Sequence, residues 1–66
     1  MQLKLKGLTL KGKNRVKENG EVWRVEIDGS FQGIPAWLVS CGKDKRWVFK
    51  ENDPDFEIIE LAPLNF

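Results

Sequence analysis

The sequence predicts a small all-β domain in which five or six strands curl into one strongly bent barrel. Apolar residues recur at every second position in short runs, which is the spacing of half-buried strands. Gly, Asn, Asp and Pro separate these runs, as turn residues do. The chain has 66 residues, too few for a two-layer sandwich of the usual size. No segment has the spacing of a convincing amphipathic helix, so none is expected.

The first apolar run contains two leucine pairs whose phase shifts across a glycine. Leu3 and Leu5 precede Gly7, and Leu8 and Leu10 follow it. A bulge or bend at the glycine would keep both pairs on one face. We therefore expect Gly7 to form a corner of the barrel.

The clearest strand lies in the middle of the N-terminal half. Trp23, Val25 and Ile27 alternate with more polar residues and predict one buried face. Asn19-Gly20 predicts a tight turn before this strand, and Asp28-Gly29 is expected to end it.

The second half of the chain predicts a loop, a hairpin and a closing strand. Residues 29–35 are expected to form a loop in which Phe31 and Ile34 could fold back as a lid over one end of the barrel. The remaining expected elements are strands at 37–41 and 46–50 joined by 42–45, a turn at 51–55 with room for one 3₁₀ turn, a strand at 56–61, and a stop at Pro63.

Three segments in this half resemble a known fold family. Ala36-Trp37-Leu38-Val39, Arg46-Trp47-Val48 and Asp55-Phe56-Glu57-Ile58-Ile59 resemble the second half of SH3-like barrels. The resemblance implies a binding module, since these barrels bind proline-rich peptides, methylated tails, nucleic acids or cell-wall peptides. Without tyrosine, the chain is unlike the SH3 domains that bind proline-rich peptides. An OB-fold is the alternative, but 42–45 leaves no space for its usual helix.

A second resemblance concerns the basic segment Lys11-Gly12-Lys13-Asn14-Arg15-Val16-Lys17-Glu18-Asn19-Gly20, followed by Trp23. It is similar to the opening of small uncharacterised proteins of tailed phages, including cyanophages. The resemblance implies a viral accessory protein of the host cytoplasm and no particular mechanism.

Composition excludes several classes of chemistry. The chain has no His and one Cys, so a His-dependent triad, a Cys/His zinc site and an internal disulfide are all impossible. Asp53, Asp55, Glu57 and Glu60 lack the ligand spacing and glycine of a calcium loop. We therefore expect a single non-enzymatic domain over residues 1–66 with no metal or cofactor.

No stretch approaches the roughly 20 consecutive apolar residues of a membrane-spanning helix. Lysines interrupt Met1–Leu10 where a signal peptide would be apolar, and the lone cysteine is typical of a reducing compartment. The sequence therefore predicts a cytoplasmic protein without membrane contact.

The charges are unevenly distributed along the chain. Residues 1–25 carry seven cations and two anions, whereas the remaining residues carry a net charge of −4. Four cations alternate within the first part, and an extended chain would place them on one side about 6.6 Å apart. With Trp23 as a stacking group, this stripe predicts DNA or RNA binding. The candidate nucleic-acid residues are Lys11, Lys13, Arg15, Lys17, Trp23 and Arg24. The alternative is a solvated edge strand whose lysines prevent edge-to-edge pairing.

The aromatic residues suggest a different kind of partner. Three Trp and four Phe exceed what so small a barrel can enclose, so one or two should be partly exposed. Trp37 and Trp47 lie on the expected hairpin and are predicted to be cross-strand neighbours, either as packing or as a ligand platform. The apolar C-terminal tail is expected to dock on the barrel, on a second copy or on a target. The alternative function is therefore a protein-interaction module that acts on a host or virion protein through Phe31, Trp37, Trp47, Leu64 and Phe66.

The sequence also leaves a purely structural role open, within a virion or an oligomer. The predicted state is a monomer or a weak homo-oligomer.

Overall fold

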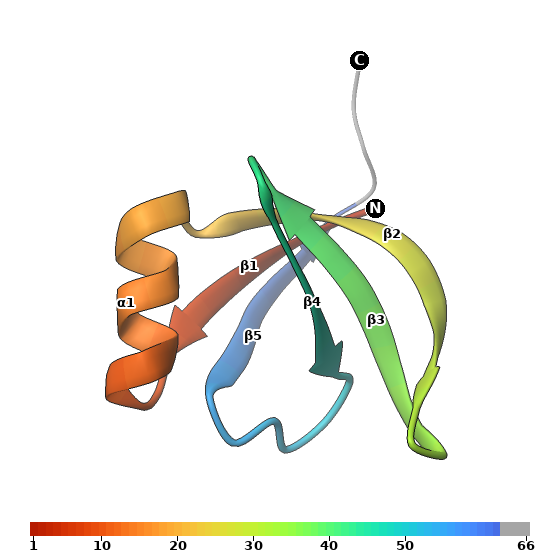
Figure 1. Cartoon of the computed structure of the whole chain (residues 1–66). Coiled ribbons are helices and arrows are strands. Elements are labelled where there is room, and N and C mark those ends of the chain that lie inside the picture. The colour runs from red at the N-terminus through yellow and green to blue at the C-terminus, as the bar shows by residue number, and fades with distance from the viewer. Residues whose placement is uncertain (63–66) are drawn as a thin grey trace.

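The computed structural model describes residues 1–62 and shows one curled antiparallel sheet with a single short helix (Figure 1). The mostly-β content confirms the predicted class, although the helix was not expected. The elements are β1 (Gln2–Gly7), α1 (Leu10–Asn19), β2 (Val22–Phe31), β3 (Ile34–Cys41), β4 (Asp44–Phe49) and β5 (Phe56–Ala62).

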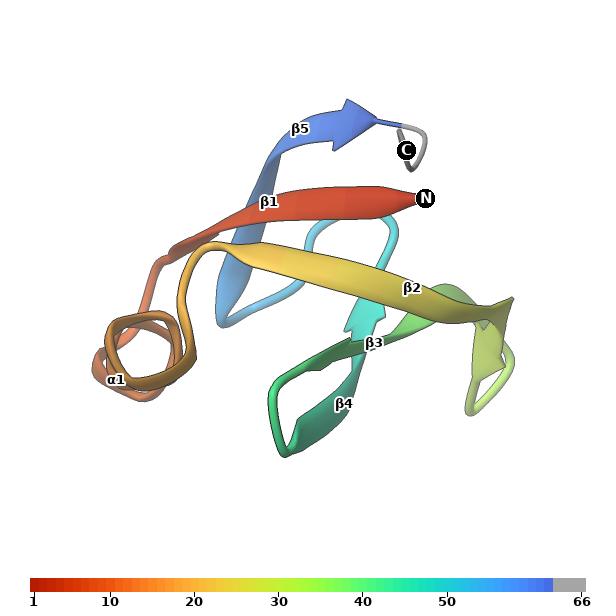
Figure 2. The same cartoon turned by 90° about the horizontal axis from the view of Figure 1, so that it is seen from above.

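The five strands follow the order β4-β3-β2-β1-β5. β2, β3 and β4 form a meander, while β1 pairs with both β2 and β5. The sheet curls around its inner face and leaves β4 and β5 as unjoined edges (Figure 2). Within the described residues the sheet therefore does not close into the predicted barrel.

The inner face of the curled sheet forms the hydrophobic core. Every strand contributes to it, and six large side chains have 2% or less of their surface exposed. Full burial of such a side chain stabilises a fold by about 1.5–3 kcal/mol. These six are Leu3, Leu5, Trp23, Val39, Val48 and Phe56.

The helix α1 occupies the segment that the sequence predicted to be extended. Thr9 caps its first turn, because the hydroxyl accepts a hydrogen bond from the Gly12 amide at 3.1 Å. Gly20 ends it with a φ of 104° and donates its amide to the carbonyl of Val16. Asn19-Gly20 therefore ends a helix and does not form a hairpin turn.

Two glycines allow α1 to approach the sheet closely. A Cβ atom on Gly7 would lie 2.4 Å from the backbone nitrogen of Lys13, and one on Gly12 would lie 2.1 Å from the carbonyl oxygen of Asp55. Gly7 ends β1 at this contact. It allows α1 to pack closely against the strand and does not form the predicted corner of a barrel. Leu8 and Leu10 do not join the core, since both are exposed.

The predicted loop at 29–35 is a tight β-hairpin. β2 runs past Asp28 and Gly29 to Phe31, and β3 begins at Ile34. The two connecting residues, Gln32 and Gly33, have φ values of 53° and 80°, as a two-residue type I′ turn requires. Phe31 and Ile34 face each other across this turn and form no lid.

The later strands lie close to their predicted positions, and the β3–β4 hairpin is confirmed. The link from β4 to β5 contains bends and no 3₁₀ turn. Buried Asp53 organises this link by accepting hydrogen bonds from the amides of Phe49, Asp55 and Phe56.

Candidate functional site

An apolar surface covers the outer face of the β2–β3–β4 meander. Directly opposed residues of antiparallel strands share a face, so the cross-strand pairs define this surface. Ile27 pairs with Leu38, Leu38 with Trp47, and Phe31 with Ile34. Phe49 lies two residues beyond Trp47 on the same side of β4. We call this set the apolar face: Ile27, Phe31, Ile34, Leu38, Trp47 and Phe49.

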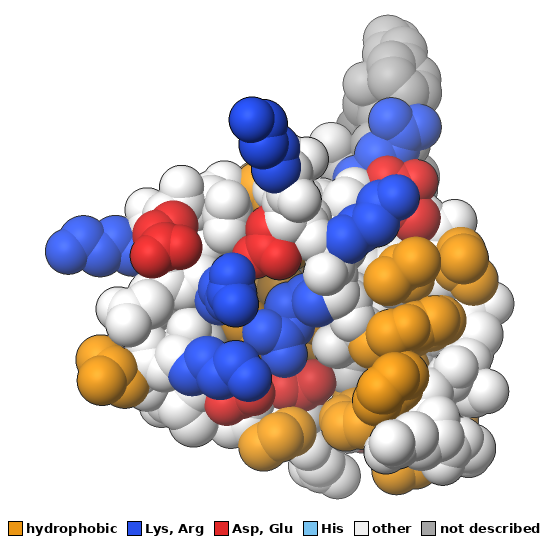
Figure 3. All heavy atoms as spheres, in the orientation of Figure 1, with side chains coloured by type: hydrophobic (Ala, Val, Ile, Leu, Met, Phe, Trp, Pro, Cys, Tyr) orange, Lys and Arg blue, Asp and Glu red, His pale blue; other side chains and the backbone are white. Residues whose placement is uncertain are grey.

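The side chains of the apolar face are partly open to solvent. Ile27, Phe31 and Ile34 expose 50%, 39% and 49% of their surface, and the other three are half-buried. The Phe31 ring stacks on Trp47 with a centroid separation of 5.9 Å and lies 6.3 Å from Phe49. Hydrophobic side chains gather along the flank formed by β2 and β3 (Figure 3).

Trp37 does not belong to this surface. It pairs with Val48 on the inner side of the sheet and is only 9% exposed. Trp37 and Trp47 therefore lie on opposite faces, and the prediction that they are cross-strand neighbours is wrong because their register differs by one residue.

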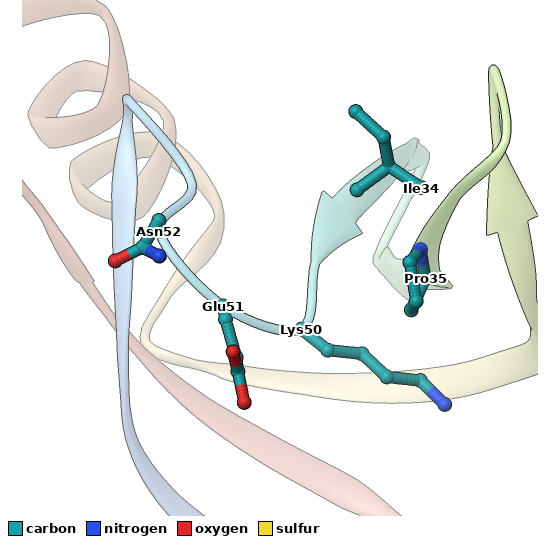
Figure 4. A pocket seen from close by; sticks show the side chains of 5 residues that line it. All are labelled: Ile34, Pro35, Lys50, Glu51 and Asn52. Carbon is teal, nitrogen blue, oxygen red and sulfur yellow. The ribbon is translucent and has the colours of Figure 1, made fainter.

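A small hollow adjoins the Ile34 end of the apolar face. Ile34 and Pro35 form one wall, and Lys50, Glu51 and Asn52 from the β4–β5 link form the other (Figure 4). Its volume is about 370 Å³. The Lys50 ammonium group points out of the hollow. It forms an ion pair with the Asp28 carboxylate at 2.5 Å and lies over the Trp37 ring.

The opposite end of the apolar face is cationic. Arg24, Ser40 and Lys45 form the cross-strand row next to Trp47, and exposed Lys43 follows in the β3–β4 turn. Glu26 is the carboxylate at this end. Its hydrogen bond from the Ser40 hydroxyl, aided by Arg24 and Lys45, lowers the pKa of Glu26. Asp44 also lies at this end of the hairpin, but its register places it on the other face, where it pairs with Arg15. On the outer face, Arg24, Lys45 and the adjoining Lys43 therefore accompany the single carboxylate of Glu26.

The predicted basic stripe is split by α1. Residues two positions apart in an α-helix are rotated by about 200° about its axis, so alternate side chains point to opposite sides. Lys11 and Arg15 share one side, where Arg15 lies 3.4 Å from Asp44. Lys13 and Lys17 share the other side and line a groove against the sheet. The prediction of one continuous row of four cations is wrong.

Trp23 cannot serve as the predicted stacking group in this conformation. Its side chain is 0% exposed, and its indole nitrogen donates to the carbonyl of Gly20 at 3.0 Å. Arg24, the next residue, points to the outer face and joins the cationic end of the apolar face. Leu64 and Phe66, predicted for a protein-binding tail, lie outside the described residues.

The acidic residues at 53–60 have separate structural partners. Asp55 accepts a hydrogen bond from the Thr9 hydroxyl at 2.7 Å and lies 3.8 Å from Arg46, while Asp53 caps backbone amides. Among the residues that the structure describes, no three acidic or cysteine side chains come together as a metal site would need. The one helix there is too short and too polar to cross a bilayer.

In the comparisons with known proteins, no family model, no curated protein and no solved structure matches this chain.

Sequence reasoning identified Phe31 and Trp47 but missed the other members of the apolar face. It placed Ile27 with Trp23 and Val25, yet the register shifts between Val25 and Ile27 and moves Ile27 to the outer face. Alternation along 45–49 places Trp47 and Phe49 together and would have found this pair.

Proposed function

We propose that this protein is a non-enzymatic binding module that docks a segment of another protein on its apolar face. The observation that carries this proposal is the contiguous set of six exposed or half-exposed apolar side chains, three of them aromatic, on an open sheet. Contiguous exposed apolar surface with polar surroundings is typical of interaction sites.

The chemistry of the apolar face favours a protein over a nucleic acid. Aromatic residues are enriched in the buried centres of protein interfaces, and Trp is prominent among residues that dominate binding energy. Three of the six side chains are aliphatic and offer no stacking surface to a base. Phe31 already stacks on Trp47, which leaves less of either ring for a base.

Charge complementarity defines the partner further. Arg24, Lys43 and Lys45 outweigh Glu26 at one end of the apolar face, so the partner segment carries apolar side chains followed by acidic ones. The resemblance to small phage proteins makes a host or virion protein in the host cytoplasm the first partner to test.

The strand order supports a finer description of the fold. A first strand paired with both the second and the last, followed by a three-stranded meander, is the connectivity of SH3-like barrels. We therefore propose an open SH3-like barrel in which α1 fills the connection between the first two strands.

Selection of random peptides displayed on phage or yeast tests the proposed function directly. Peptides that bind the protein should share apolar residues followed by acidic ones. Their binding should shift the amide resonances of the apolar face. Salt should weaken only the part of the affinity that the acidic residues contribute, because exposed charges are screened and apolar contacts are not. Trp47→Ser and Phe31→Ser should each weaken binding at least about tenfold, as loss of an interface anchor does. Leu10→Ser, at an exposed apolar residue of α1, is the matched control and should leave binding unchanged.

Three results would contradict the proposal. One is the absence of any shared peptide pattern. Another is a resonance map that avoids the apolar face. The third is a set of concentration-dependent shifts on that face without peptide, which would identify a second copy of the chain as its occupant.

A further inference from the structure

A groove between α1 and the β1–β5 side of the sheet has a different character from the apolar face. Its volume is about 450 Å³, and three lysines line it: Lys6 from β1, and Lys13 and Lys17 from α1. Leu5, Val16 and Ile59 supply its apolar lining. The geometry points to this groove as a second binding site, which holds the phosphate backbone of a single-stranded nucleic acid.

The fold brings these three lysines together from β1 and from the helix that follows it in the chain. Lys13 and Lys17 are one helical turn apart, so their Cβ atoms lie about 5–6 Å apart on the same side of α1. The Gly7–Gly12 contact draws α1 against the end of β1, where Lys6 precedes Gly7. The result is a groove with cations on both sides.

The charges of the groove are mostly unneutralised. Within residues 1–61, none of these lysines has a carboxylate oxygen within 4.0 Å. Glu21 is the acidic residue that lines the groove, and its carboxylate lies 3.7 Å from Lys4. Glu57 stands opposite Lys6 in the β1–β5 register without forming an ion pair. The site therefore attracts a ligand with several negative charges.

The shape of the groove favours a polymer over a single small anion. The groove that the lysines line is open to solvent and is not an enclosed cavity, and Ile59 in its lining is 48% exposed. A phosphate backbone offers repeated charges to the lysines and sugar carbons to the apolar surface. No aromatic residue lines the groove, so we expect binding without base preference.

Fluorescence anisotropy with a labelled oligo-dT strand tests this site. Three lysine–phosphate contacts predict that the logarithm of the affinity falls with the logarithm of salt concentration with a slope of about −2. Lys13→Glu should weaken binding several-fold, and adding Lys17→Glu should weaken it further and bring the slope to about −0.7.

Lys11→Glu is the matched control because it makes the same charge change in the same exposed helix, on the opposite side. It should leave affinity and slope close to those of the unaltered protein. Equal losses for Lys11→Glu and Lys13→Glu would overturn the site, because they would indicate attraction to overall charge alone. Absence of binding at low salt would also overturn it. So would equally tight, lysine-dependent binding of a poly-glutamate strand.

The groove and the apolar face can be tested independently of each other. Lys13→Glu should leave peptide binding to the apolar face intact, and Trp47→Ser should leave oligo-dT binding intact. An oligo-dT resonance map centred on the apolar face would overturn the groove as the nucleic-acid site.

Discussion

At the scale of single residues, Asp53 fixes the connection between β4 and β5. Its buried carboxylate accepts three backbone hydrogen bonds, from both ends of the link. Asp53→Asn retains the size but replaces one acceptor oxygen with a donor, so at least one buried amide loses its partner. We expect a loss of about 1–3 kcal/mol in the free energy of unfolding, measured by urea denaturation. Exposed Glu51 in the same link is the control, and Glu51→Gln should change stability by less than about 0.5 kcal/mol.

Asp28 gives a prediction about pH. The hydrogen bond from the Lys50 ammonium group lowers the pKa of Asp28 below its ordinary value. The carboxylate therefore stabilises the folded state at a pH above about 4, and this contribution is lost as the pH falls through the folded-state pKa. A carboxyl ¹³C titration should show a low midpoint for Asp28, and Lys50→Gln should raise it. An unchanged midpoint in that variant would contradict the assigned cause.

At the scale of elements, the contact of α1 with the sheet reverses the effect on stability that helix propensity alone predicts for Gly12→Ala. In an exposed helix, Gly→Ala stabilises by about 1 kcal/mol. At Gly12 the new Cβ would lie 2.1 Å from the Asp55 carbonyl oxygen. We therefore expect Gly12→Ala to destabilise the protein by about 1–3 kcal/mol in thermal or urea unfolding. Asn14→Ala, at an exposed position of α1, should be neutral or stabilising. A stabilised Gly12→Ala protein would show that the contact is loose.

The strands of the second half were predictable because side-chain alternation and turn residues agree there. The helix was not, because it buries little apolar surface: Gly12 is buried, Val16 is partly buried and Leu10 is exposed. The sequence features that indicated the helix were its capping residues, Thr9 before it and Gly20 after it.

At the scale of the whole molecule, we expect Trp23 to determine stability and Trp47 to determine binding. Trp23 fills the core, and removal of such a side chain costs about 3–5 kcal/mol. A domain of 66 residues has a total stability of about 3–10 kcal/mol. Trp23→Ala should therefore abolish most cooperative unfolding in circular dichroism. Trp47→Ser should retain a cooperative transition, because Trp47 lies on the outer face. A Trp47→Ser protein that fails to fold would show that this surface is structural.

The candidate site was predictable only in part. The excess of aromatic residues over core volume correctly indicated that some would be exposed, and Phe31 and Trp47 were among those named. The predictions that Trp23 stacks on a base and that Trp37 contacts a protein partner were wrong, because both side chains are buried. Alternation along a strand does not say which of its two faces covers the core. The lysines were named correctly as an exposed basic set, but a helix divides them between two surfaces.

The sequence by itself determined the all-β class, the positions of the later strands, and the absence of histidine chemistry and of an internal disulfide within these 66 residues. These properties follow from local periodicity, turn residues and composition. Only the tertiary structure decided which aromatics are exposed and which lysines stand together. Those outcomes depend on a one-residue register shift between β2 and β3 and on the close contact between Gly7 and α1. Both arise from packing between elements, which alternation along a single segment does not report.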